Sequence, residues 1–283
     1  DTADTYGLGA NEQLLGRFIA DGGAARRARL VPATKFGIVR EKGRYERRID
    51  NSPAYIRAAC EASLQRLGVE RIGLYYCHRR DPQVPLEDMV GTLADLVREG
   101  KVAAIGLSEV SAASLRTAHA VHPIAAVQSE YSLWERGAEA EVLPTTRELG
   151  VAFVAYSPLG RSFLTNQPPA ADTLEPGDFR LALPRFQGEA AAANLSLQQG
   201  LAAIATELGQ PAAAVALAWL LHRQPHVLPI PGTRRLHHLQ QNLAASALVL
   251  PAPVVQALDT LFAPGRAQGA RYPDAGWAGV ETR

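Results

Sequence analysis

Short apolar segments alternate with longer helix-like segments along nearly the whole chain, and this alternation limits what the chain can fold into. We expect strands at 29–35, 71–78, 102–107, 124–127, 151–155 and 226–230. We expect helices at 11–21, 53–67, 86–99, 111–121, 139–149, 190–208, 211–223, 235–245 and 253–262, with a polar loop at 40–52 and an irregular stretch at 158–187. Strands that are apolar almost throughout are typical of a parallel sheet covered on both faces.

Two α/β architectures fit this pattern, an open doubly wound sheet and a closed (β/α)8 TIM barrel. An open sheet that binds a dinucleotide should carry a GxGxxG turn after a strand, and the sequence has none. A barrel instead gathers functional side chains at the carboxyl ends of several strands. Polar or aromatic residues close the apolar runs here, namely Asp1, Tyr6, Lys35, His78, Ser108, Gln128, Tyr156 and Thr233. We therefore predict one barrel domain over residues 1–283.

Composition excludes several classes of protein. The 283 residues carry a net charge of +1, which gives no electrostatic footprint for nucleic acid or a membrane surface. No apolar run is long enough to span a bilayer, and no signal peptide is present. Cys60 and Cys77 are far apart and outside any CxxC spacing, so we expect neither a disulfide nor a metal site, and a cytoplasmic location.

Four of the strand-end residues suggest one chemistry when they are taken together. Taken one at a time, Lys35 is typical of a solvated residue at a strand end, and His78 is typical of a histidine in the core. Asp1 and Tyr6 are residue types that are common in turns. A barrel would bring all four to one rim. There a Lys35 cation would favour the phenolate of Tyr6 and lower its pKa, and Asp1 would keep the lysine charged. His78 would orient a carbonyl oxygen or relay a proton, with Tyr6 as general acid towards a carbonyl reduced by hydride.

The chain resembles the aldo-keto reductases along nearly its whole length. The resemblance rests on DTADTYGxxxNEQLLG (1–16), ATKFG (33–37), LYYCHRRDPQVPLED (74–88), GKVAAIGLSEVS (100–111), QSEYSLWER (128–136), GVAFVAYSPLGRSFL (150–164), LPRFQGE (183–189), ALAWLL (216–221) and PIPGTRRLHHLQQNL (229–243). It implies that Asp1, Tyr6, Lys35 and His78 correspond to the family's catalytic tetrad. It also implies a nicotinamide cofactor, usually NADPH, bound without a Rossmann fold.

The resemblance assigns cofactor residues as well. Tyr156 corresponds to the aromatic residue that stacks on the nicotinamide, and Ser108 and Gln128 to the groups that hold its carboxamide. Ser157, Leu159 and Gly160 correspond to the pyrophosphate loop, and Gly232, Thr233, Arg234, Arg235, Gln241 and Asn242 to the adenosine-phosphate site. Independently, a helix that begins near Arg235 would attract phosphate, and two arginines favour NADP(H) over NAD(H). Alternatively, Arg234 and Arg235 are simply solvated residues at the start of a helix.

The sequence departs from the family pattern in three places. Glu109 stands where many members carry Asn, and Gln241 stands where an acidic residue is common. The family has a strand–helix unit and most of a second strand before the DTA motif, and the chain given begins at that motif. Because a barrel without them would expose sheet edges, we expect the natural protein to be longer.

Two functions from different classes fit the sequence. The first is NADPH-dependent reduction of an aldehyde or ketone, a small-molecule carbonyl substrate, to an alcohol. The second is a cofactor-binding regulatory or sensor subunit with little turnover, and a truncated or inactive product is a third option. The loops at 38–51, 133–137 and 161–187 and the tail at 263–283 should set the substrate. Tyr272 and Trp277 would either form an aromatic wall of the substrate site or pack outside the barrel. The sequence does not indicate the oligomeric state.

Overall fold

The chain divides into two compact units in the computed structural model, which describes residues 1–40 and 47–281. The first unit contains 1–128, 141–152 and 278–283, and the second contains 129–140 and 153–277. Strand β6 starts in the first unit and its last two residues belong to the second. The expected single domain over 1–283 stays a prediction.

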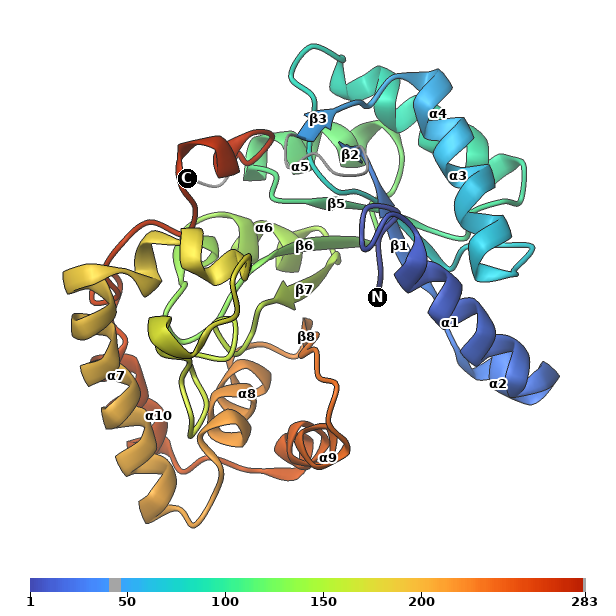
Figure 1. Cartoon of the computed structure of the whole chain (residues 1–283). Helices are drawn as coiled ribbons and strands as arrows, with labels where there is room; N and C mark the ends of the chain where they lie inside the picture. Colours follow the sequence, from blue (N-terminus) through green and yellow to red (C-terminus); the bar gives the residue numbers. More distant parts are fainter. Residues whose placement is uncertain (41–46, 282–283) are drawn as a thin grey trace. The chain divides into compact units, whose positions relative to one another are not determined.

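A parallel sheet forms the centre of the first unit, with its strands in the order β1-β4-β5-β6 (Figure 1). They are β1 (Ala33–Phe36), β4 (Leu74–Cys77), β5 (Ile105–Ser108) and β6 (Ala126–Glu130). In this register Lys35 lies opposite Tyr76, and Ser108 lies opposite Gln128. The carboxyl ends of the strands, which carry the polar residues noted above, therefore meet at one edge of the sheet.

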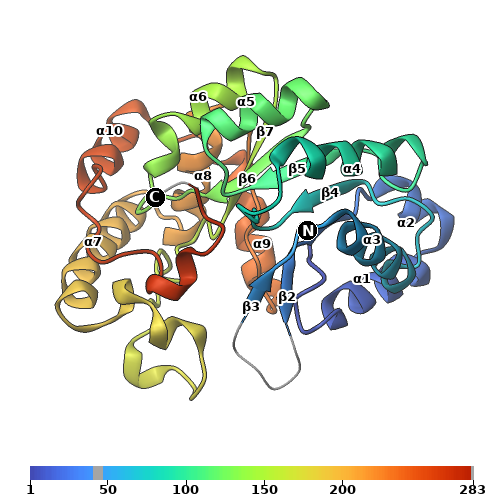
Figure 2. The same cartoon turned by 90° about the horizontal axis from the view of Figure 1, so that it is seen from above.

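Helices follow the strands of the first unit, as the alternation predicts. They are α1 (Ala10–Asp21), α2 (Gly23–Arg29), α3 (Pro53–Leu67), α4 (Leu86–Arg98), α5 (Ala112–Val121) and α6 (Val142–Glu148). Helix α3 begins where Ser52 accepts a hydrogen bond from the Tyr55 amide and Pro53 takes the first position. Helices α3 and α4 pack side by side, against β1 and β5 respectively (Figure 2).

Three elements of the first unit were not expected from the sequence. Strands β2 (Ile38–Arg40) and β3 (Arg47–Ile49) form an antiparallel ladder inside the segment expected to be a loop. Each strand has three residues, and Ile38 pairs with Ile49 between charged neighbours. Strands this short cannot show an alternation of apolar and polar residues in the sequence. Helix α2 is seven residues long, rich in arginine and has no buried residue, and so lacks an apolar face.

The second unit pairs β7 (Ala152–Tyr156) with β8 (Val227–Pro229) in parallel. Its helices are α7 (Gly188–Glu207), α8 (Ala212–Arg223), α9 (Leu236–Ala244) and α10 (Ala252–Leu261), and α7 packs against both α8 and α10. Helix α8 is buried from Ala212 to Leu220, whereas α9 has no buried residue. The irregular stretch contains short 3-10 turns at Ala171–Thr173, Phe179–Ala182 and Pro184–Phe186.

Taken one at a time, the helices within residues 1–40 and 47–281 are too short or too polar to cross a lipid bilayer. Helices α7 and α8 reach the required length and apolar character only as a pair, with a 90° bend between them.

A buried ion pair joins α1, α3 and β1. The Glu12 carboxylate is fully buried; it accepts from Arg66 Nε at 2.6 Å and from the Thr34 hydroxyl at 2.6 Å. The Arg66 side chain is 24% exposed. Since a buried carboxylate is costly without a partner, this contact fixes the helix that follows Tyr6 onto the sheet.

Replacing Arg66 with Met is expected to lower the free energy of unfolding by about 3 kcal/mol, the lower end of the range for a broken buried pair. The reason is the Glu12 charge that is left in an apolar site. Denaturant unfolding checks this, with Arg98→Met as the control, because the Arg98 side chain is 76% exposed beside Asp95. Equal losses in the two variants would contradict this account.

Candidate active site

The segment from Thr2 to Gly9 begins alongside β1 and carries the first candidate residues. The Thr2 amide donates to Ala33 O at 2.8 Å, and the Asp4 amide donates to Lys35 O at 3.0 Å. Three consecutive left-handed residues, with φ of 59°, 54° and 89°, then turn the chain into α1. Glycine at the first and third of these, Gly7 and Gly9, accommodates this geometry, and it leaves Tyr6 at the turn.

Lys35 is the buried centre of the site. It lies in β1 with no exposed surface, and its Nζ donates to the Asp1 carboxylate and to Thr2 O, the latter at 2.8 Å. The second oxygen of Asp1 accepts from Gln128 Nε2 at 2.8 Å. A buried ammonium requires such partners, so the sequence around Asp1 and the end of β6 together hold the lysine in place.

Tyr6 and His78 face each other beside this lysine. Their ring centroids are 5.8 Å apart at 84°, an edge-to-face contact, and Lys35 Nζ lies 5.3 Å from the Tyr6 ring centroid. The His78 amide donates to Phe36 O at 2.8 Å, which ties the end of β4 to the end of β1. The Tyr6 residue is 41% exposed and His78 is buried, so the pair stands between solvent and the buried charge.

Sequence reasoning missed Tyr76, which packs beneath the lysine. Its ring centroid is 5.9 Å from Lys35 Nζ, and the ring occupies the space that a side chain on Gly106 would fill. A Cβ at Gly106 would come within 2.5 Å of the Tyr76 ring and within 2.9 Å of a backbone oxygen of β6. The glycine of the GLSEVS motif is therefore needed for the close approach of β4 and β5.

The pKa of Tyr6 differs from the sequence-based expectation. Burial raises the pKa of Tyr6 above its usual value of 10.0; the charges of Arg79 and Arg40 oppose this rise. For Lys35, burial and then the charge of Arg79 lower the pKa to about 7, and the negative charge of Asp4 opposes this shift. The expected lowering of the Tyr6 pKa by Lys35 was wrong, because loss of solvent outweighs the nearby cations. A phenol with a raised pKa stays protonated at neutral pH.

Arg79, directly after His78, is a second residue that sequence reasoning missed. Its side chain is buried, and Nη1 donates to His78 O at 2.6 Å and to the Ser108 hydroxyl at 3.2 Å. Successive strand residues point to opposite faces, so the strand pattern gave no reason to select it. Ser108 and Gln128, the two residues expected to hold a carboxamide, are thus next to Arg79 and Asp1 in the same unit.

In the second unit Tyr156 closes β7 and meets the C-terminal tail. Its hydroxyl lies 2.8 Å from the Tyr272 hydroxyl, which also accepts from Arg161 Nη2 at 3.1 Å. The Trp277 ring packs on Tyr272 edge to face, with centroids 5.6 Å apart. Tyr272 of the tail therefore contacts Tyr156, the residue expected to stack on nicotinamide. The expected substrate loop at 38–51 falls partly outside the described residues, as does the end of the tail.

The loop after Tyr156 is shaped by unusual backbone angles. Ser157 and Gly160 have φ of 48° and 54°, and a Cβ on Gly160 would come within 2.7 Å of the Trp134 ring. The Gly160 amide donates to Ser157 O at 2.8 Å, which closes a tight turn. A backbone that only glycine adopts freely, held in a tight turn, is suited to close contact with a phosphate.

Five of the residues expected to bind the cofactor line one cavity of about 730 Å³ in the second unit. They are Leu159, Gly232, Thr233, Gln241 and Asn242. Its wall also includes His237 and His238, whose rings are 4.0 Å apart. The Nδ2 of Asn242 is buried and has no acceptor among the described residues. A cavity with an unsatisfied amide donor fits the adenosine end of a dinucleotide, which supplies acceptor nitrogens and oxygens.

Arg234 and Arg235 are outside this lining. Both are exposed, and Arg235 precedes the first turn of α9, where its amide donates to the Thr233 hydroxyl at 3.1 Å. Long exposed arginine side chains at the start of a helix are free to reach a phosphate but are also well solvated.

Comparison with known proteins decides the family. A model of the aldo/keto reductase family matches residues 1–263. The chain belongs to the aldo/keto reductase family. Its fold is therefore the α/β, (β/α)8 barrel fold of that family, and NADP(H) is the cofactor that the family uses. Family members are oxidoreductases that act on small-molecule carbonyl compounds.

Solved structures of aldo/keto reductases resemble the chain closely. A glycerol dehydrogenase from Gluconobacter oxydans has 28% identity and a TM-score of 0.85, over 95% of this chain and 82% of that one. A thermostable aldo-keto reductase in complex with the inhibitor epalrestat has 28% identity and a TM-score of 0.73, over 92% and 81%. An aldo/keto reductase from Klebsiella pneumoniae in complex with NADP and acetate has 27% identity and a TM-score of 0.70, over 96% and 82%.

Proposed function

We propose that this aldo/keto reductase reduces an aldehyde or ketone to an alcohol with NADPH. The observation that carries the proposal is the contact of Tyr6, Lys35 and His78 within one unit, with Asp1 on the lysine. When bound, the reduced cofactor supplies the hydride that the carbonyl carbon accepts. The protein must then provide a proton and hold the carbonyl oxygen.

Each residue of this group has one role in the proposal. Tyr6 donates the proton to the carbonyl oxygen, which its raised pKa permits at neutral pH because the phenol remains protonated. Lys35 stabilises negative charge on the tyrosine oxygen after the transfer, and Asp1 positions Lys35. His78, packed against the Tyr6 ring, orients the substrate carbonyl.

The proposed cofactor contacts are given for each unit by itself. In the first, Ser108 and Gln128 would hold the nicotinamide carboxamide. In the second, Tyr156 would stack on the ring, Ser157, Leu159 and Gly160 would follow the pyrophosphate, and Gly232, Thr233, Gln241 and Asn242 would enclose the adenosine. The cavity that Leu159 shares with four of these residues, and its orphaned Asn242 amide, support this assignment. Arg234 and Arg235 would bind the 2′-phosphate.

Replacing Arg234 or Arg235 with Ala is expected to weaken NADPH binding by about tenfold, with NADH binding nearly unchanged. The reason is that only NADPH carries the phosphate that an arginine can pair with. Fluorescence titration of both cofactors checks this, with the exposed Arg266→Ala as the control for general loss of positive charge. A parallel loss for both cofactors would contradict the assignment.

NADPH oxidation with a panel of aromatic and aliphatic aldehydes tests the function itself. Turnover with at least one aldehyde, faster with NADPH than with NADH, is expected. Binding of NADPH without turnover on any aldehyde would favour the regulatory subunit instead.

A further inference from the structure

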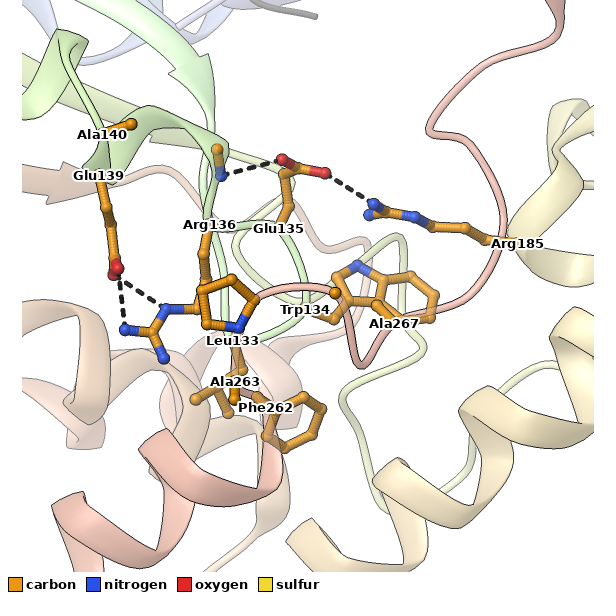
Figure 3. A pocket seen from close by; sticks show the side chains of 13 residues that line it. Leu133, Trp134, Glu135, Arg136, Glu139, Ala140, Arg185, Phe262, Ala263 and Ala267 are labelled. Carbon is orange, nitrogen blue, oxygen red and sulfur yellow. Dashed lines mark hydrogen bonds and ion pairs between the residues drawn. The ribbon is translucent and has the colours of Figure 1, made fainter.

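A second cavity in the second unit, of about 530 Å³, shares no residue with the proposed cofactor and catalytic groups. It is formed by the loop after β6 and by the segment after α10, and Arg185 extends from a third segment towards Glu135 (Figure 3). Leu133, Trp134, Phe262, Ala263 and Pro264 give it apolar walls. Its size is that of a site for a small organic molecule.

Arg185 has an unused hydrogen-bond donor at this cavity. The residue is 8% exposed; Nη2 donates to Glu135 at 2.7 Å and Nε donates to Gly269 O at 3.1 Å. Its Nη1 is buried and meets no acceptor in the part of the chain that the structure describes. Arg136, on the same cavity, differs in that it donates to both Glu139 and Asp259. A buried guanidinium nitrogen without an acceptor indicates that a partner is missing.

Trp134, on the same cavity, has a second hydrogen-bond donor without an acceptor in the described chain. The residue is 3% exposed, its Nε1 has no acceptor among the described residues, and the Arg185 guanidinium carbon lies 5.5 Å from its ring. Figure 3 shows the indole and the guanidinium next to each other on one side of the cavity. The N–H groups of Arg185 and Trp134, one of them charged, favour a ligand group that only accepts hydrogen bonds.

The charges around the cavity favour a single negative charge. Glu135 lies between Arg185 and Arg271, while Glu139 and Asp259 share Arg136 and Arg223. Arg161 and Glu130 complete the cluster, so five guanidinium groups face four carboxylates in the described chain. Among these described groups the positive charges outnumber the negative ones by one. A dianionic phosphate would bring a second charge close to Glu135, which a monoanion avoids.

We propose that this cavity binds a small organic carboxylate. The carboxylate accepts from Arg185 Nη1 and Trp134 Nε1, and the apolar body of the ligand rests against Leu133 and Phe262. The cavity shares no residue with the proposed cofactor and catalytic groups, and much of its lining comes from the loops and tail that are expected to set the substrate.

Calorimetric titration of the NADP(H)-saturated protein with benzoate tests the proposal. Benzoate is expected to bind at one site, and Arg185→Gln to weaken it at least about tenfold, because a charge-assisted hydrogen bond is lost. Benzamide, which keeps the shape without the charge, should bind more weakly. Replacing Arg180, a partly exposed arginine paired with Asp178, with Gln should leave benzoate binding unchanged, as should Tyr6→Phe.

A second variant decides the matter if Arg185→Gln does not fold. Ala263→Leu fills the cavity from a partly exposed wall and leaves the Arg185–Glu135 pair intact, so it should abolish benzoate binding. Benzoate that does not bind, or that binds equally well to both cavity variants, overturns the proposal. Loss of binding in Tyr6→Phe alone would also overturn it, because the carboxylate would then occupy the catalytic residues.

Discussion

Replacing Tyr6 with Phe is expected to lower kcat/KM for aldehyde reduction by about 10²–10⁴, the usual contribution of a general acid. The substitution removes one hydroxyl and keeps the ring that packs on His78 at 5.8 Å. The loss should therefore appear in kcat, while the dissociation constant of NADPH and the unfolding midpoint stay close to those of the parent. Steady-state kinetics with a saturating cofactor measures this.

Tyr55→Phe is the matched control for this experiment. Tyr55 is in the same unit, and its hydroxyl donates to Asp4 at 3.3 Å, away from Lys35 and His78. Removing that hydroxyl should change the rate only slightly. Similar losses in the two variants would mean that Tyr6 acts through the structure of the N-terminal segment and donates no proton.

Replacing Lys35 with Met is expected to lower kcat by about 10²–10³, the cost of removing one group that stabilises charge in the transition state. The lysine is fully buried, donates to Asp1 and Thr2, and lies 5.3 Å from the Tyr6 ring centroid. Methionine fills a similar volume without the charge. A variant that retained full activity would remove Lys35 from the proposed mechanism.

The same variant should also change how stability depends on pH. The pKa of Lys35 is lowered from 10.5 to about 7 in the folded chain. Between these two values the unfolded chain binds a proton that the folded chain does not, so this group makes the folded state more stable as pH rises. Below pH 7 both states carry the proton, so this group no longer makes stability depend on pH.

Denaturant unfolding of parent and Lys35→Met at several pH values isolates this effect. The parent should gain stability relative to the variant as pH increases from 7 towards 10.5. A constant difference between the two curves would show that Asp1 keeps the lysine charged throughout.

The sequence predicted the positions of the catalytic candidates because strand ends are readable. Lys35 and His78 each close an apolar run, and parallel strands place their carboxyl ends at one edge, where the structure finds both. The short ladder of β2 and β3 was not readable, because three-residue strands among charged residues have no period. Helix α2 could not be predicted either, because it has no buried residue and therefore no apolar face.

The electrostatics and the cavities could not be predicted from the sequence. The direction of the Tyr6 pKa depends on how much water the fold removes, which no motif encodes. Arg79 follows a candidate residue and reaches Ser108 only because β4 and β5 are neighbours. The wall of the second cavity comes from residues as far apart as Leu133, Arg185 and Ala267. Such a site exists only after the chain has folded.

Deuterium transfer tests the central claim most directly. The protein would be supplied with NADPH deuterated at the reactive position of the nicotinamide and with an aldehyde from the active panel, and the alcohol would be analysed by mass spectrometry. The account predicts an alcohol with one deuterium on the former carbonyl carbon, formed in step with cofactor oxidation and strongly reduced in Tyr6→Phe. Cofactor binding with no labelled alcohol from any aldehyde or ketone would contradict it.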